Sequence, residues 1–241
     1  MNININGVDF GILYEDADAV AISKPPHVLS QKSEGGEDSV LEYLNAYAGG
    51  QWEAYPVHRL DRGTGGVMIV AKNKSSAAAL SALASGDGMK KEYLACVHGK
   101  LEGSGTLEHY LYFDRKRNKS FPVKDSSRRG VKRAILDYEA LSHAECEAGE
   151  ITLVKIRLHT GRTHQIRVQM ATVGHPLLGD GKYGGRDNKC KCALWSHKIT
   201  FDSSAVNGTS LKKRDFAKAV RETPDAFTST PDGYPWDLFN E

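Results

Sequence analysis

The chain has 241 residues, of which 40% are hydrophobic and 26% charged, and its formal net charge at pH 7 is +2. These values exclude a disordered or fibrous chain and predict a soluble globular protein. Apolar runs such as 67–71 are far shorter than the roughly 20 residues of a membrane span, and the N-terminus lacks the layout of a secretory signal. Four cysteines in a chain of this length do not indicate a disulfide scaffold. We therefore expect a cytoplasmic protein with no membrane partner.

Charge is distributed unevenly along the chain. Residues 1–53 carry nine acidic side chains against two lysines, a net charge of −7, whereas residues 114–133 carry nine basic side chains against two aspartates, a net charge of +7. Such polarity can attract a polyanion to one face of a molecule that stays soluble. A solvated loop rich in lysine and arginine explains the charge run equally well. The stretch 114–133, which includes Arg128 and Arg129, is called the basic segment below.

In the first half of the chain, residue patterns predict short strands and two helices. Residues 12–24 read as two strands around an acidic turn, ended by two prolines. Residues 39–50 have apolar positions at helical spacing, and residues 73–86 form a second short helix. Between them, VMIVAK at 67–72 is a continuous apolar run, typical of a strand buried on both faces.

In the second half, strands dominate the prediction. They are expected at 91–97, 133–141, 153–159 and 193–201. After Gly161, a helix is predicted in which Ile166, Met170 and Val173 form one apolar stripe. Strands outnumber helices without regular alternation, so we predict an α+β fold with a mixed, largely antiparallel sheet flanked by helices and loops.

Nothing in the sequence divides the chain, because it has no internal repeat, low-complexity tract or linker. We predict one catalytic domain over residues 1–241, with its core at about 12–201. Residues 202–241, which hold three of the eight prolines, are expected to pack irregularly against that core.

The stretch HRLDRGTGG at 58–66 places a histidine, two arginines, an aspartate and three glycines directly before the predicted buried strand. Asp61 lies among His58, Arg59 and Arg62, on a loop where a rigid sheet can hold a catalytic group. An aspartate near arginines is expected to stay ionised, which suits a nucleophile better than a general acid. A charged turn with a purely structural aspartate is an equally good interpretation of this stretch alone.

A second candidate stretch is GRTHQIR at 161–167. Arg162, His164 and Arg167 surround a predicted helix start, where free backbone amides and arginine forks favour anions. Surface arginines on an amphipathic helix are the alternative, most plausible for Arg162. Tyr93, in the strand at 91–97, is in isolation expected to be an ordinary core residue.

Metal and nucleotide motifs are lacking. Cys190 and Cys192 with His197 lack the second ligand pair of a zinc site. No phosphate-binding loop, dinucleotide fingerprint or zinc-protease motif occurs. We therefore predict neither a metal nor a cofactor.

Four motifs in order resemble the RluA-type family of RNA pseudouridine synthases: ILYEDADAVAISKPP, HRLDRGTGGVMIVAKN, KEYLACVHGKL and GRTHQIRVQMATVGHPLLGDGKYG. The resemblance runs from about Ile12 to Phe201. Two departures are Gly65, where the family usually has Ser, and His27, where a Gly is usual. Because the first motif begins at about Ile12, we also expect no separate N-terminal RNA-binding module of the kind that many relatives carry.

The resemblance implies a cofactor-free isomerase acting on uridine in ribosomal or transfer RNA. Asp61 would attack the target nucleoside, Arg167 would pair with Asp61, and Tyr93 would stack on the flipped uracil and assist proton transfer. Arg59 would fill the space that the flipped nucleotide leaves.

We further expect His58, Arg162, His164, Arg128 and Arg129 to bind the RNA, and the protein to be a monomer. Two alternatives remain open at this point. One is an RNA chaperone of the same fold without turnover, and the other is a hydrolase with an aspartate nucleophile, which would usually need a second carboxylate nearby.

Overall fold

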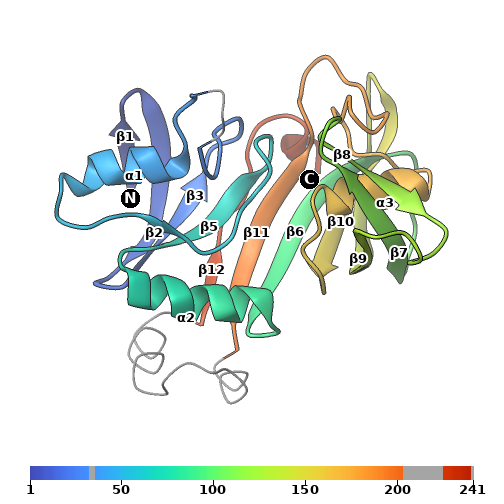
Figure 1. Ribbon diagram of the computed structural model, residues 1–241. Helices are drawn as coiled ribbons and strands as arrows, with labels where there is room; N and C mark the ends of the chain where they lie inside the picture. The colour runs from blue at the N-terminus through green and yellow to red at the C-terminus, as the bar shows by residue number, and fades with distance from the viewer. Residues whose placement is uncertain (33–35, 203–224, 240–241) are drawn as a thin grey trace. The chain divides into compact units, whose positions relative to one another are not determined.

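The structure is a computed structural model that describes residues 1–32, 36–202 and 225–239. Its elements are shown in Figure 1. The chain divides into two compact units, each described here by itself. Unit 1 contains Met1–Lys91 and Ser196–Thr230, and unit 2 contains Glu92–Trp195 and Pro231–Glu241.

Unit 1 is built on a sheet covered by helices. Its strands are ordered β1 (Asn2–Ile5), β2 (Val8–Glu15), β3 (Ala19–Lys24), β5 (Gly65–Ala71) and β11 (Leu194–Phe201), the last shared with unit 2. The short strands β4 (Tyr55–Pro56) and β12 (Ala226–Thr228) pair antiparallel with β5 and β11. The helices are α1 (Val40–Ala48) and α2 (Lys74–Ser85).

The predicted elements of unit 1 are confirmed, but the strand β1 and the short strands β4 and β12 were not predicted. Residues 12–24 form parts of β2 and β3, while the predicted helices correspond to α1 and α2. The longest of these missed strands, β1, pairs antiparallel with β2. Asn6 and Gly7, both with positive φ, join the two strands. An Asn-Gly pair between apolar positions is a strong hairpin signal, so the sequence contained the information.

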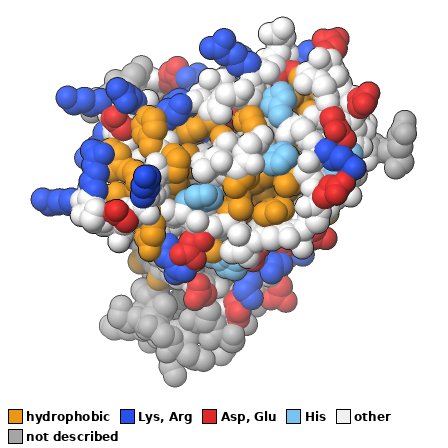
Figure 2. Space-filling model, turned by 90° about the vertical axis from the view of Figure 1, so that its right-hand side faces the viewer, with side chains coloured by type: hydrophobic (Ala, Val, Ile, Leu, Met, Phe, Trp, Pro, Cys, Tyr) orange, Lys and Arg blue, Asp and Glu red, His pale blue; other side chains and the backbone are white. Residues whose placement is uncertain are grey.

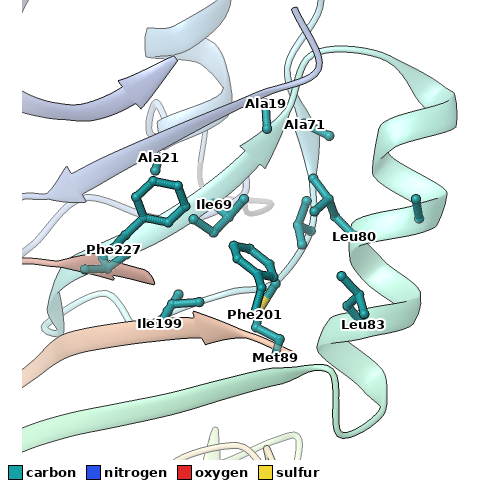
Figure 3. Close-up of a cluster of buried hydrophobic side chains, with 13 residues drawn as sticks. Ala19, Ala21, Ile69, Ala71, Leu80, Leu83, Met89, Ile199, Phe201 and Phe227 are labelled. Carbon is teal, nitrogen blue, oxygen red and sulfur yellow. The ribbon is translucent and has the colours of Figure 1, made fainter. Parts of the chain in front are cut away.

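One hydrophobic cluster of unit 1 lies between the sheet and α2 (Figure 3). All seven residues of β5 are buried, as the continuous apolar run predicts. Leu80 and Leu83 of α2 pack in one cluster with Ile69 of β5 and Phe201 of β11. This packing fixes β5, the strand that directly follows the 58–66 stretch, and so gives that stretch a rigid base.

Unit 2 contains the longest strands. Their order is β6 (Met89–His98), β10 (Gly149–Leu158), β9 (Val131–Cys146), β7 (Ser104–Asp114) and β8 (Lys119–Val123). Its helices are α3 (Gln165–Thr172) and the short 3-10 helix η2 (Trp236–Phe239). Sequence reasoning placed strands at β6, β9 and β10 but did not predict β7 or β8, the hairpin at the start of the basic segment.

The expected apolar stripe on α3 is partly wrong. Ile166 and Met170 are buried, but Val173 is 38% exposed, because the helix ends at Thr172 and Val173 is its C-cap. Polar Gln169 is buried instead, and its amide nitrogen donates hydrogen bonds to the carbonyl oxygens of Leu107 and Ala134. The helix thus binds β7 and β9 through a buried amide, which a search for apolar periodicity cannot detect. Of the predicted packing segment 202–241, residues 203–224 and 240–241 lie outside the described residues.

The second residue of β5, Gly66, cannot be replaced by a larger residue without strain. Gly66 has a φ of +102°, and a Cβ added there would overlap the carbonyl oxygen of Ser196 on β11. Ser196 also donates from its hydroxyl to the carbonyl of Val67 at 2.9 Å. The glycine therefore allows the two strands to approach closely where the 58–66 stretch enters the sheet.

Gly66→Ala is expected to destabilise the protein by about 3 kcal/mol or more, since it combines an unfavourable φ with a backbone clash. Chemical denaturation measures this change. Gly161→Ala is the matched control, because Gly161 has no positive φ and no atom within 4 Å of an added Cβ. A cost for Gly66→Ala no larger than for the control contradicts the close approach.

Candidate active site

The loop that carries Asp61 is fixed on both sides of the aspartate. Leu60, directly before it, donates its N–H to the hydroxyl of Ser30 at 2.9 Å, and that hydroxyl donates to the carbonyl of Leu60 at 2.8 Å. Arg62, directly after it, accepts the N–H of His27 on its carbonyl at 2.8 Å. The Asp61 carbonyl accepts from Thr64 N–H at 3.0 Å, which closes a turn. Asp61 itself is half-buried, on a backbone that has little freedom.

Beneath this loop lies a buried cation that sequence reasoning did not single out. Lys24, the last residue of β3, is fully buried. Its ammonium donates to the carbonyls of Pro25 at 2.9 Å, Val28 at 2.8 Å and Arg62 at 3.3 Å. One side chain thus connects the loop after β3 to the loop that carries Asp61. The signal for it was the Lys-Pro pair of the first motif.

The charge of Asp61 affects the ionisation of Lys24. Burial lowers the pKa of Lys24 to about 7, and the carboxylate of Asp61 opposes that effect by raising it. Removing an ammonium from water disfavours its charged form, while a nearby carboxylate favours that form. The average positive charge of Lys24, which lies beside Asp61, therefore changes with pH near neutrality.

The neighbours of Asp61 divide into an anchor and two exposed arginines. His58 accepts the N–H of Ile69 on Nε2 at 3.0 Å, and burial together with Lys91 lowers its pKa to about 3. It is therefore neutral and ties the loop to β5. Arg59 is exposed, and Arg62 is an exposed partner of Glu37 at 3.1 Å.

The second predicted stretch forms a tight turn at the start of α3 in unit 2. The side-chain oxygen of Gln165 accepts from Arg162 N–H at 3.0 Å and from the Thr160 hydroxyl at 2.8 Å. His164 caps the helix with a φ of +55°, and its Nδ1 lies 3.0 Å from the hydroxyl of Tyr183. Arg162 donates from Nε to the carbonyl of Arg133 at 2.9 Å. The turn is thus held by side-chain hydrogen bonds.

Arg167 is held in place by a carboxylate that the sequence analysis did not assign. Its Nε and Nη2 donate to the two oxygens of Asp180 at 2.6 and 2.8 Å, and Asp180 is buried. The guanidinium also lies 5.3 Å from the ring centre of Tyr183. Two-point pairing of this kind fixes the plane of the guanidinium. Asp180 and Tyr183 belong to the last quoted motif, which was the available signal.

The remaining predicted residues also lie in unit 2. Tyr93 is 7% exposed on β6. Arg128 and Arg129 are exposed on the segment between β8 and β9, and Arg128 stacks on the ring of Tyr112 at 3.6 Å. Thus Asp61, His58 and Arg59 lie together in unit 1, whereas the other six predicted residues belong to unit 2.

The described residues contain neither a candidate metal site nor a candidate membrane-spanning helix. Among them, no group of three or more His, Cys, Asp or Glu side chains is placed to hold a metal ion. All four cysteines are free thiols. Burial, followed by the charge of Asp187, raises the pKa of Cys190 to about 12, which disfavours its thiolate. Within the described part of the chain, no helix has the length and hydrophobicity needed to cross a membrane.

Comparisons with known proteins agree with the sequence motifs. Residues 18–172 match the family model described as RNA pseudouridylate synthase. A ribosomal large subunit pseudouridine synthase D from Borreliella burgdorferi is 32% identical over 92% of this chain and 68% of its own length. Its Escherichia coli counterpart is 32% identical over 85% of this chain. An uncharacterized RNA pseudouridine synthase of Bacillus subtilis, YhcT, is 34% identical over 73% of this chain.

These relatives are longer than the chain, which spans 63% of the Escherichia coli protein and 58% of YhcT. Among solved structures, human RNA Pseudouridylate Synthase Domain Containing 1 matches with a TM-score of 0.69 over 92% of this chain and 97% of that one, at 23% identity. This likeness concerns the fold, and it confirms the predicted α+β class.

Lys24→Met tests the buried ammonium. A lysine whose folded pKa is lowered from 10.5 to about 7 binds fewer protons when folded than when unfolded between these values. Its ionisation therefore costs stability in full below pH 7, and that cost is relieved as the pH rises. The free energy of unfolding of the wild type, relative to Lys24→Met, is expected to rise by up to about 1.4 kcal/mol per pH unit between pH 7 and 9.

Denaturant unfolding at several pH values measures this difference. Lys72→Met provides the control, since the Lys72 ammonium pairs with Glu15 at 2.9 Å near the surface of the same unit. A difference between wild type and Lys24→Met that stays constant with pH contradicts the buried charge.

Proposed function

Since the chain belongs to the RNA pseudouridylate synthase family, as its four motifs predict, we propose that it converts uridine to pseudouridine in RNA with Asp61 as the nucleophile. The matched region, residues 18–172, includes Asp61, Tyr93 and Arg167. The observation that carries the proposal is the loop of Asp61. Its flanking residues are held by Ser30, His27 and Lys24, while the carboxylate remains half-buried.

The hydrogen-bonded loop suits a nucleophile such as Asp61, whose position must be fixed before the substrate binds. A carboxylate on a rigid backbone loses little entropy when it attacks a bound nucleoside. The carboxylate of Asp61 raises the pKa of the buried Lys24 ammonium, so the two groups interact electrostatically.

The proposed reaction leaves the elemental composition of the nucleoside unchanged. The carboxylate of Asp61 adds to the sugar carbon or to the base, and the bond between the sugar and N1 of uracil breaks. The base rotates, a bond forms between the sugar and C5, and the carboxylate leaves. The proton lost from C5 is balanced by the proton gained at N1. No oxidant, reductant or phosphate transfer is involved.

Other residues have supporting roles in this proposal. In this proposal, Tyr93 stacks on the uracil and assists the transfer of the C5 proton. Arg167, which Asp180 orients through two hydrogen bonds, acts as the partner of Asp61 in the reaction. Arg59, which is exposed, occupies the space of the flipped nucleotide. Arg162 and His164 bind the substrate backbone, while His58 contributes through the loop that it anchors.

Ribosomal RNA is the proposed partner, because two of the relatives are named for the large ribosomal subunit. The exposed arginines Arg128 and Arg129 support phosphate binding by the basic segment. We place the activity in the cytoplasm, carried out by a monomer.

Asp61→Asn is expected to abolish release of tritium from RNA labelled at C5 of uridine, since the amide is a very poor nucleophile. RNA binding by the same variant is expected to stay within about threefold of wild type, because the substitution changes few contacts with the RNA backbone. Glu37→Gln, which removes an exposed carboxylate near the same loop, is the control and keeps its turnover. Full tritium release by Asp61→Asn overturns the proposal and leaves a binding protein.

The double variant Arg128→Glu/Arg129→Glu tests the basic segment. It is expected to weaken RNA binding by about tenfold or more at 0.1 M salt and to flatten the dependence of log K on log salt, because fewer counterions are released. Titrations of RNA at several salt concentrations measure both effects. If affinity and slope match those of the wild type, the basic segment does not bind the RNA.

A further inference from the structure

The β7–β8 hairpin has two unlike faces. On one face, Leu111 packs in a buried cluster with Ala134 and Val168, the latter on α3. Strand residues alternate between faces, so Tyr112 lies on the other side, directly opposite Phe121 of β8. Both rings are only partly buried. The hairpin therefore presents aromatic side chains away from the core.

A pocket of about 430 Å³ lies on this second face. Tyr112, Phe121 and Val123 form its apolar part. Its charged side chains are Asp114, Lys116, Arg117 and Arg128. The volume is within the range of small-molecule sites, and the whole pocket belongs to unit 2.

The rings and cations are already in contact. The guanidinium of Arg128 lies 3.6 Å from the ring centre of Tyr112, and the ammonium of Lys119 lies 5.6 Å from that of Phe121. Lys and Arg side chains stand beside hydrophobic ones on the face of unit 2 shown in Figure 2. A flat side chain resting on an exposed ring occupies the place that a stacked nucleobase takes.

The residues that line the pocket indicate which class of ligand fits it. Phosphate contacts alone need cations and no rings, whereas an apolar peptide needs no cluster of three cations. Single-stranded nucleic acid needs both, because its bases stack on aromatic rings while its phosphates pair with Lys and Arg. The carboxylate of Asp114 adds an acceptor for an N–H group on the edge of a base.

We propose that this pocket binds one unpaired nucleotide of the RNA, other than the target uridine. Its base stacks on Tyr112 and Phe121, Arg128 moves to cover the base, and Lys116 and Arg117 contact the adjoining phosphates. The choice of RNA as the ligand rests on the proposed function. The pocket thereby gives the basic segment a preference for single-stranded over paired RNA.

The test uses an oligoadenylate of about eight nucleotides, which contains no uridine and so reports binding independently of turnover. Fluorescence anisotropy with the full chain measures its affinity over a salt series. Tyr112→Ala is expected to weaken binding between about 5-fold and 150-fold, the range for loss of one stacked base, with an unchanged salt slope. Tyr112→Phe keeps the ring and is expected to stay within about twofold.

Tyr110→Ala is the matched control, since Tyr110 lies two residues earlier on the same strand and does not line the pocket. Thermal melting of each variant shows whether the hairpin still folds. Affinity unchanged in folded Tyr112→Ala, or lost equally in Tyr112→Phe and Tyr110→Ala, overturns the pocket. Oligoadenylate binding that depends on Tyr112 in a protein without isomerase activity would instead refute only the proposed function.

Discussion

One buried ammonium organises the loop on which the proposed chemistry depends. Lys24 donates hydrogen bonds to carbonyls of its own loop and to the carbonyl of Arg62, next to the candidate nucleophile. Burying a cation is unfavourable, as its lowered pKa shows, and the carbonyl oxygens offset only part of that cost. The burial of Lys24 gives local order in return. Its ammonium donates to three backbone carbonyls, and these hydrogen bonds fix the loops that carry the carbonyls.

A comparable arrangement occurs in unit 2, with the charges reversed. There the buried carboxylate of Asp180 holds Arg167 by two hydrogen bonds. Buried ion pairs contribute little net stability, but they orient their members closely. Each unit therefore uses a buried charged residue, absent from the predicted site, to position a residue that the family motifs single out. Substitutions at Lys24 or Asp180 would affect chemistry through geometry.

Sequence reasoning found the α-helices, many of the strands and the motif residues, but it missed the residues that support them. The apolar run of β5 and the helical spacing of α1 depend on local periodicity, so they were predictable. The exposed Val173 and the buried Gln169 were not, because they depend on where α3 ends and on strands distant in sequence.

The same limit applies to the site and the pocket. The HRLD stretch identified Asp61, yet Lys24 precedes it by 37 positions, and only the fold brings the two together. Two residues of the 58–66 stretch have structural roles, since Gly66 allows the close approach of two strands and His58 anchors the loop. Tyr112 and Phe121 are unremarkable in sequence and become a candidate surface only when β7 and β8 pair.

The most direct test of the catalytic role of Asp61 is a map of pseudouridines in ribosomal RNA from cells that lack this gene, after complementation. The proposed role predicts that at least one pseudouridine disappears with the gene, returns with the wild-type chain and does not return with an asparagine at position 61. A map that loses no site on deletion, or one restored equally by the asparagine variant, would contradict it.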